Sequence, residues 1–405
     1  MKQRLMTSTL LLMAMCLAMG LTASATTTRY VNGVTGGDSN NCLSPATACK
    51  TIGHAISLSA SGDSIRVAAA IYKENLTIAF TMTITGASAT TTIVDGGGAG
   101  TVFTISSTSA HVTLSNLTIR NGNVSAGFPR GGGIYNLGTL RITNSAVIRN
   151  TVTSQCYELC PVSGGGIYNH VGATLTISDS SITGNLASAS CRQGGCGAGG
   201  GGIFSGGTLT ISNSTLSGNT AHSVFRGGNG GSGGGILNDG TLTINNSTFS
   251  SNSALGAGGG IFDPGVATVN NSTFNGNTAP TGGGIWTLSS LTLQNSIVAN
   301  SPSGGNCSGT MTSKGYNLSS DATCNFSGPG DMNNINPNIG PLQNNGGPTQ
   351  TMALLPGSPA IDAGNPTGCT DSLGHLLKTD QRGDPRPNIE DTGGCDMGAY
   401  ERQSD

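Results

Sequence analysis

The sequence predicts an all-β protein wound into a solenoid of parallel strands, a parallel β-helix, because one short unit repeats along the chain. Each unit opens with Gly-Gly-Gly-Ile. After the isoleucine, apolar residues two positions apart alternate with Ser and Thr, which is the spacing of strands, whereas a helix needs spacings of three and four. Most units end on an asparagine. The opening motif stands at 131–134, 164–167, 200–203, 233–236, 258–261 and 282–285.

The shortest units set the size of one coil. Successive units end at Asn252, Asn277 and Asn300, so one unit takes about 23 to 25 residues. This length suits one turn of a three-sided β-helix better than a helical repeat of about 33 residues or more. Strands this short cannot form a sheet within one unit. Stacked units can pair them in parallel and bury a continuous apolar interior.

The glycines and the terminal asparagines are expected at the corners of the coils. At a corner the backbone must adopt positive φ or pass close to the coils above and below, and glycine does both without a Cβ clash. Asparagines stacked at another corner can bond to one another along the rod, since neighbouring strands lie about 4.8 Å apart. We therefore expect both motifs to be structural. The asparagines are Asn150, Asn185, Asn219, Asn252 and Asn277.

Both ends of the solenoid need a cover. Degenerate coils of the same kind lie between residues 75 and 122. Before them, the segment 49–60 places Ile52, Ala55 and Ile56 on one helical face, which predicts a capping helix over the first coil. At the other end, the charged residues of the tail are expected to pair with one another and close the last coil. They are Asp380, Arg382, Asp384, Arg386, Asp396 and Glu401.

The first 25 residues have the features of an export signal. Lys2 and Arg4 precede an apolar run, and Ala23-Ser24-Ala25 forms a small-residue cleavage site. No later stretch of about 18 apolar residues follows, so we expect no transmembrane segment. The mature protein is expected to be secreted or extracellular, or associated with the outer membrane or cell envelope.

Ten cysteines follow the signal, and an exported protein meets an oxidising compartment in which disulfides form. Bonds between near neighbours are the simplest connectivity. A four-cysteine zinc site built from the second and third pairs is the alternative, although its spacings differ from those of paired zinc knuckles. The pairs are Cys42/Cys49, Cys156/Cys160, Cys191/Cys196, Cys307/Cys324 and Cys369/Cys395.

The composition argues against a nucleic-acid partner. Only 9% of the residues are charged, and the formal net charge is -2. Removing Lys2 and Arg4 from the 17 basic residues leaves 15 against 19 acidic ones, so the mature chain is more negative still. It therefore has no basic stripe that could neutralise phosphates.

Two stretches resemble known families. The repeats, with Phe249-Ser-Ser-Asn252 and Phe274-Asn-Gly-Asn277, resemble the GGA[ILV] and FxxN repeats of chlamydial polymorphic outer-membrane proteins. NPNIGPLQNNGGPTQTMALLPGSPAIDAG, then DQRGDPRP and CDMGAYE, is similar to the choice-of-anchor Q domain of bacterial secreted right-handed β-helix proteins. The expected domains are a signal peptide (1–25), an N-terminal cap of the solenoid (26–75), the β-helix repeats (76–330) and a choice-of-anchor Q-like segment (331–405).

The resemblance implies a right-handed parallel β-helix of the pectin lyase-like type with an N-terminal capping helix. It implies an adhesin-like or glycan-binding role at the cell surface. The expected partner is a polysaccharide, or a glycan or protein of another cell surface, and the protein is expected to be a monomer.

Insertions in the repeat all fall in one place. From the terminal asparagine to the next glycine triplet the chain runs 14, 15 and 14 residues after Asn150, Asn185 and Asn219, but only 6 and 5 after Asn252 and Asn277. Three successive coils thus carry long loops on one edge. Insertions confined to one face of a solenoid often build its binding face, although neutral loop drift gives the same pattern.

A row of aromatic residues is the candidate binding surface. The residue after each motif isoleucine is aromatic in five of six units. If this position faces outward, the rings suit stacking on an extended polysaccharide. If it faces inward, they form a core stack; burial, or shelter under the long loops, is the interpretation that we favour. The five are Tyr135, Tyr168, Phe204, Phe262 and Trp286.

The alternative function is that of a polysaccharide lyase or hydrolase of the pectate-lyase type, since β-helix folds also host such enzymes. A lyase needs clustered charge, with Ca²⁺ or Arg to neutralise the acid of the substrate. Between residues 96 and 320 the chain has only four acidic residues. Asp239 and Asp263, in adjacent coils, with Arg226 nearby, are the best catalytic candidates. Outside this alternative we expect no catalytic group, metal or cofactor.

Overall fold

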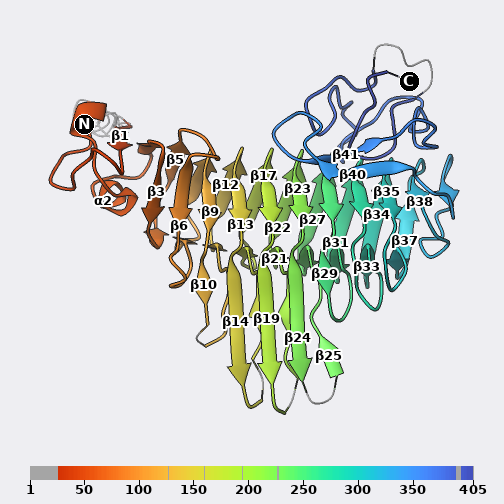
Figure 1. Ribbon diagram of the computed structural model, residues 1–405, viewed down its shortest axis with the longest axis horizontal. Helices are drawn as coiled ribbons and strands as arrows, with labels where there is room; N and C mark the ends of the chain where they lie inside the picture. Colours follow the sequence, from red (N-terminus) through yellow and green to blue (C-terminus); the bar gives the residue numbers. More distant parts are fainter. Residues whose placement is uncertain are drawn as a thin grey trace, which may run out of the picture.

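The chain forms a right-handed parallel β-helix, in which most coils contribute a strand to each of three long sheets (Figure 1). The computed structural model describes residues 26–125, 127–158, 160–193, 195–225, 228–388 and 394–404. The expected signal peptide lies outside this part of the chain. The fold class predicted from the repeat is confirmed.

Sheet C contains the strands that begin at the motif isoleucines. It has nine strands: β4 (Leu76–Ile78), β7 (Phe103–Ile105), β11 (Ile134–Asn136), β16 (Ile167–Asn169), β21 (Ile203–Ser205), β26 (Ile236–Asn238), β30 (Ile261–Asp263), β33 (Ile285–Thr287) and β36 (Cys307–Ser308).

Sheet A follows sheet C in every coil. Its eleven strands are β1 (Thr28–Val31), β2 (Ser64–Val67), β5 (Met82–Gly86), β8 (His111–Ser115), β12 (Thr139–Thr143), β17 (Thr174–Ser178), β22 (Thr208–Ser212), β27 (Thr241–Asn245), β31 (Val266–Asn270), β34 (Ser290–Gln294) and β37 (Met311–Ser313).

Sheet B completes the coil. Its eleven strands are β3 (Ala70–Lys73), β6 (Thr92–Asp95), β9 (Thr118–Arg120), β13 (Ala146–Ile148), β18 (Ser181–Thr183), β23 (Thr215–Ser217), β28 (Thr248–Ser250), β32 (Thr273–Asn275), β35 (Ile297–Ala299), β38 (Leu318–Ser319) and β39 (Met332–Asn333).

The apolar positions of the repeat line the interior of the rod, as the strand spacing predicts. In the coil that begins at Ile134, the residues Leu140, Ile142 and Val147 are all fully buried. Equivalent residues stack from coil to coil, and the rings of Phe249 and Phe274 lie face to face with centroids 4.5 Å apart. The register of the repeat therefore fixes the register of the sheets.

The glycine triplets turn the corner before sheet C, for the two reasons expected. Gly131 has a φ of 62°, a conformation that residues with a side chain rarely adopt. Gly132 lies so close to its neighbours that an added Cβ would meet the carbonyl oxygens of Gly165 and Thr151 at 2.5 and 2.6 Å. The first glycine supplies the conformation and the second supplies the space.

The predicted asparagine ladder is present at the corner between sheets B and C. In each of its steps the backbone N–H and side-chain amide of one asparagine donate to Oδ1 of the next. Between Asn219 and Asn252 these distances are 3.1 and 2.9 Å. The ladder runs through Asn150, Asn185, Asn219, Asn252 and Asn277. Asn300 is exposed and lies outside it.

The other two corners also carry polar ladders, which sequence analysis missed. Between sheets A and B, the backbone N–H of Ser145 donates to Oγ of Ser180 at 3.0 Å, and the same bond recurs along the stack to Ser296. Between sheets C and A, the amide of Asn136 donates to Oδ1 of Asn169 at 2.8 Å. Polar groups that would otherwise be buried without a partner are thus satisfied by the next coil.

The N-terminal cap contains the predicted helix. A short 3₁₀ turn, η1 (Pro45–Thr47), precedes helix α2 (Ile52–Ser57), whose Ile52, Ala55 and Ile56 are buried against the first coils. Glu74 accepts the backbone N–H groups of Ile52 and Gly53 at 2.8 and 2.7 Å at the start of the helix. Burial raises the pKa of this carboxyl group.

The C-terminal tail folds back along the rod and does not merely close its last coil. It includes an antiparallel hairpin, β40 (Ile339–Gln343) and β41 (Thr351–Leu354), and lies over the later strands of sheet B (Figure 1). Oγ1 of Thr248 donates to Oε1 of Gln381 at 2.7 Å, and the N–H of Ala399 donates to Oγ1 of Thr273 at 3.0 Å. The tail therefore packs on the last coils, as expected, and also extends further back along the rod than the sequence predicts.

The charged residues of the tail do pair with one another. Arg386 contacts Glu401 at 2.7 Å with both side chains fully buried, and Arg382 contacts Asp380 at 2.7 Å. Arg382 also lies over the ring of Tyr400. These pairs fix the fold of the tail against the solenoid.

Candidate functional site

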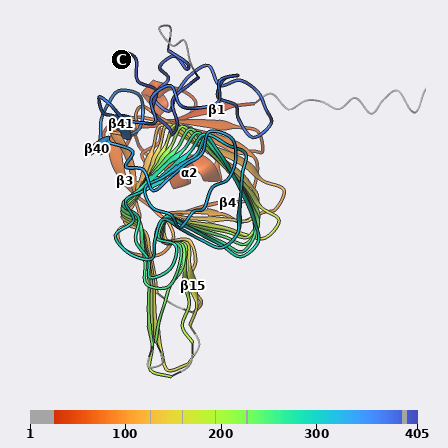
Figure 2. The ribbon, with the colours of Figure 1, turned by 90° about the vertical axis from the view of Figure 1, so that its right-hand side faces the viewer.

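The three long loops form a fin that projects from the corner between sheets B and C. Figure 2, which looks along the rod, shows the fin extending from one corner of the coil. Strands β14 and β19 run outward, and the short strands β15 and β20 run back. The fin strands are β10 (Asn123–Val124), β14 (Thr151–Cys156), β15 (Val162–Ser163), β19 (Leu186–Cys191), β20 (Ala198–Gly199), β24 (Thr220–Phe225), β25 (Gly228–Gly230) and β29 (Ser253–Ala254).

The fin has an apolar core of its own, formed by small residues and cysteines. Val152 and Ala187 on the outgoing strands pack with Val162 and Ala198 on the returning ones. Two disulfides, Cys156–Cys160 and Cys191–Cys196, close the loops. The fin is thus a clipped two-layer element, which limits the conformations open to its loops.

All five predicted near-neighbour disulfides are present. The remaining bonds are Cys42–Cys49, Cys307–Cys324 and Cys369–Cys395. In the fin the sulfurs of the two bonds gather as the stacked coils predict, with Cys160 and Cys191 at 3.4 Å. Zinc binds thiolates, whereas these four sulfurs are paired in disulfides. The structure therefore agrees with the predicted disulfides and not with the four-cysteine zinc site.

The aromatic row faces outward from sheet C. Each ring occupies the middle of a three-residue strand whose flanking residues point into the rod; Ile134 and Asn136, on either side of Tyr135, are fully buried. Centroid distances are 5.3 Å from Tyr135 to Tyr168, 4.9 Å from Tyr168 to Phe204, and 4.4 Å from Phe262 to Trp286. Leu237 fills the gap between the two groups. The orientation that the sequence left open is therefore outward.

The rings present their edges to solvent, which changes the expected mode of binding. Interplanar angles of 5°, 4° and 10° show that the faces are turned toward one another along the rod. A chain laid along the row would meet ring edges, which carry partial positive charge, and not the flat faces. Faces are available at the ends of the row, where the register partners are small. Thr104 lies beside Tyr135 in the preceding coil, and Ser308 lies beside Trp286 in the following one.

The base of the fin shelters the middle of the row. An added Cβ on Gly199 of β20 would lie 2.8 Å from Leu237 and 3.6 Å from Phe204. The guanidinium of Arg130 lies 5.0 Å from the ring centroid of Tyr168, which is only 5% exposed. Burial raises the pKa of the Tyr168 phenol, so the hydroxyl stays protonated at neutral pH. Shelter under the long loops was expected for these rings.

Sequence analysis missed Arg130, although a signal for it exists. It stands immediately before the first glycine triplet in a chain that has few charges, and so at the foot of the fin beside the aromatic row. At this distance an exposed Arg–aromatic contact contributes about 0.5 to 1 kcal/mol.

The two candidate acids lie in different environments. Asp263 is fully buried in the ladder between sheets C and A, where its Oδ1 accepts from the amide of Asn238 at 2.6 Å and its Oδ2 accepts from Oγ1 of Thr287 at 3.3 Å. Asp239 is exposed in the turn after β26. Burial raises the pKa of the Asp263 carboxyl group. Arg226, the third member of the proposed constellation, lies outside the described residues.

Replacing Asp263 by asparagine is expected to stabilise the protein at neutral pH. Asn136 and Asn169 hold the same ladder position in earlier coils, so the amide fits. Because the folded state raises the pKa of Asp263, its contribution to stability falls as pH rises from the ordinary aspartate value through the raised one. D263N removes this penalty, and we expect a gain of about 1 kcal/mol in the free energy of unfolding at pH 7.

Urea unfolding of both proteins at pH 7 and pH 4 checks this prediction. The stability difference should shrink at pH 4, where both the folded and unfolded states of the wild type approach protonation at this site. A variant that is less stable than the wild type at pH 7 would show that the charge on Asp263 is needed in the fold.

Comparisons with known proteins yield fold neighbours alone. No family model matches the chain, and no curated protein matches it. Among solved structures, the chain is similar to pectate lyase Pel9A, with 15% identity and a TM-score of 0.47 over 93% of this chain and 98% of that one. It is also similar to a rhamnogalacturonan lyase, with 11% identity and a TM-score of 0.29 over 65% of this chain and 84% of that one.

The fold class itself follows from the strand pairing. The resemblance to polymorphic outer-membrane proteins and to the choice-of-anchor Q domain stays a prediction. No helix in the described part of the chain is long and apolar enough to cross a membrane.

Proposed function

We propose that this protein is an exported, non-catalytic glycan-binding protein, and that the aromatic row beside the fin is its recognition surface. The observation that carries the proposal is the outward row of rings that ends at Trp286. This side chain is partly exposed, and the next coil places a serine, Ser308, beside its outer face. An indole face with a small neighbour is a platform on which a sugar ring can stack.

The position of the row relative to the fin supports the proposal. Short connections after Asn252 and Asn277 leave the Phe262–Trp286 end without a fin loop. The fin rises beside the other end, at Tyr135 and Tyr168. A glycan can therefore contact the Trp286 platform and the partly exposed ring of Phe262 beside it together. Because both surfaces belong to a rigid, disulfide-clipped framework, binding costs little conformational entropy.

The location proposed for this activity is outside the cell or on its envelope. Five disulfides suit an oxidising compartment, and the expected signal peptide would take the chain there. The ligand class proposed is a polysaccharide, free or displayed on another surface.

The alternative, a lyase of the pectate-lyase type, is the second activity to test. Asp263 is committed to the interior ladder by its contacts with Asn238 and Thr287, so it does not face a substrate bound to the outside of the rod. Incubation with uronate polymers would show an enzyme by the absorbance of unsaturated products. Turnover of such a polymer would contradict the non-catalytic role.

Replacing Trp286 by alanine is expected to lower glycan retention about tenfold or more, because a tryptophan that packs on a ligand often carries much of the binding energy. The test is affinity electrophoresis or pull-down against a panel of polysaccharides, first with wild type to find the ligand. Trp286→Phe keeps a ring and should keep much of the binding.

A matched control separates specific glycan recognition from non-specific adhesion. Leu288, two residues further along the same coil, is 66% exposed. L288A should bind as the wild type does. Equal losses in W286A and L288A, with unchanged circular dichroism, would reveal non-specific adhesion. Full retention by W286A would remove the row from the binding site.

A further inference from the structure

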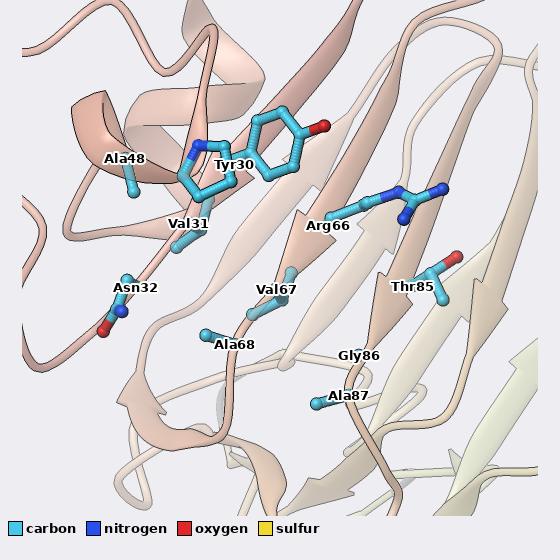
Figure 3. Close-up of a pocket in the computed structure, with 11 residues that line it drawn as sticks. Tyr30, Val31, Asn32, Ala48, Arg66, Val67, Ala68, Thr85, Gly86 and Ala87 are labelled. Carbon is cyan, nitrogen blue, oxygen red and sulfur yellow. The ribbon is translucent and has the colours of Figure 1, made fainter.

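A separate cavity of about 370 Å³ lies at the opposite end of the rod from Trp286, where the first strands of sheet A meet the cap (Figure 3). Three neighbouring strands build it in register: Tyr30 of β1 pairs with Arg66 of β2, and Arg66 pairs with Thr85 of β5. Figure 3 shows these side chains along one side of the cavity, with Asn32, Ala68 and Ala87 along the other.

The floor of the cavity is the backbone of sheet A, and it is firmly held. The side chains of Val31 and Val67 alternate to the inner face of the sheet and are buried in the core of the rod. Next to them, Gly86 approaches the following coil so closely that an added Cβ would lie 2.2 Å from the carbonyl oxygen of Asn116. Pro45 and Ala48 also line the cavity, and both belong to the loop closed by the Cys42–Cys49 disulfide. The shape is therefore present before any ligand arrives.

The polar side chains of Arg66 and Asn32 offer hydrogen-bond donors to the cavity. Arg66 is exposed and makes no hydrogen bond or ion pair with the described residues. Oδ1 of Asn32 already accepts from the N–H groups of Val34 and Thr35 at 3.0 and 3.1 Å, so its amide nitrogen is the group left to donate. The described lining includes no carboxylate. One cation without a paired carboxylate thus stands beside a cavity whose apolar lining includes Ala48, Ala68 and Ala87.

We propose that this cavity binds a small carboxylate with a flat apolar body, of the size of benzoate or 4-hydroxybenzoate. The guanidinium of Arg66 pairs with the carboxylate through two parallel hydrogen bonds, and the ring of Tyr30 packs on the body of the ligand. The apolar lining favours an apolar body over a sugar ring, because hydroxyls would meet the side chains of Ala48, Ala68 and Ala87 without partners. The volume lies near the lower limit of about 300 Å³ for ligand pockets, so it suits one small molecule and not a polymer.

This inference is independent of the aromatic row. The cavity lies on sheet A and the cap, whereas the row lies on sheet C, and the two share no residue. W286A should therefore leave the cavity unchanged, and loss of binding in this cavity should leave glycan retention intact.

The test measures binding of benzoate to the full mature chain by ligand-observed NMR and calorimetry. Benzyl alcohol is the neutral probe, and glucuronate is the sugar-acid probe. We expect a Kd of about 0.1 to 1 mM for benzoate, in keeping with the size of the ligand. Arg66→Gln should weaken benzoate binding about tenfold or more, and Arg66→Lys should weaken it less because the charge remains. Tyr30→Ala should weaken benzoate and benzyl alcohol alike.

Arg141→Gln is the matched control, because Arg141 is an exposed arginine on β12 of the same sheet and outside the cavity. It should bind benzoate as the wild type does. The proposal is overturned by equal affinity for benzoate and benzyl alcohol, by tighter binding of glucuronate, by wild-type affinity in a folded R66Q, or by no binding of benzoate at about ten times the expected Kd.

Discussion

Replacing Gly234 by alanine should destabilise the protein by about 3 kcal/mol or more, or prevent it from folding. An added Cβ would lie 2.5 Å from the carbonyl oxygen of Gly259 and 2.5 Å from both the nitrogen and the oxygen of Ser253. All three are backbone atoms that pair with neighbouring strands, so none can move without breaking the stack. The φ of Gly234 is not positive, so the expected loss of stability comes only from the lack of room for a Cβ.

Gly197 provides the control for this change. It lies in the returning part of the fin, where nothing lies within 4 Å of an added Cβ and φ is not positive. G197A should stay within about 0.5 kcal/mol of the wild type in urea unfolding followed by circular dichroism. If G234A and G197A unfold at the same urea concentration, the coils do not approach as closely as the glycine corner requires.

Replacing Asn219 by alanine should destabilise the protein by about 3 to 5 kcal/mol, because four bonded groups lose a partner in a dry corner. Its amide donates to the carbonyl of Ile182 at 2.8 Å and to Oδ1 of Asn252 at 2.9 Å. Its own Oδ1 accepts from the backbone N–H and the side-chain amide of Asn185, both at 3.0 Å. Alanine supplies none of these groups. Because Asn219 is fully buried, the groups that lose a partner stay buried without one.

An asparagine on the outside of the rod is the matched comparison. The side chain of Asn275 is half-buried on sheet B and accepts an exposed hydrogen bond from Asn300 at 2.8 Å. N275A should cost no more than about 0.5 kcal/mol. Thermal unfolding of the two variants gives the comparison, and similar melting temperatures would contradict the role assigned to the ladder.

The repeat predicts the solenoid because each of its residue types has one physical reason to stand where it does. The alternation at Leu140 and Ile142 gives a strand, and Gly131 and Asn150 mark the corners. The cap helix is predicted for the same reason, since Ile52, Ala55 and Ile56 lie on one face. Near-neighbour cysteines in an exported chain predict the disulfides because local bonds are the simplest connectivity.

The site is less predictable because it depends on relations between coils. A serine that follows Asn or Asp stands before each strand of sheet B from β13 to β35, and the ladder from Ser145 onward follows from these pairs. One such pair alone does not tell which corner it serves. The orientation of the rings could not be predicted because a turn separates each of them from the next strand. The alternation of inward and outward side chains cannot be counted across this turn. Tyr30 and Arg66 are 36 positions apart, and only strand pairing brings them to one cavity. The tail packs on distant coils through single contacts such as Thr248 to Gln381.

Fluorescence of Trp286, the only tryptophan in the chain, gives the most direct test of the proposed recognition surface. The mature protein is titrated with the polysaccharide that it retains, and calorimetry on the same samples supplies the binding isotherm. The predicted result is a saturable shift of the emission to shorter wavelength, because a sugar that stacks on the indole excludes water. The midpoint of this shift should agree with the midpoint of the calorimetric isotherm. Saturable binding with an unchanged emission spectrum would contradict this placement of the glycan.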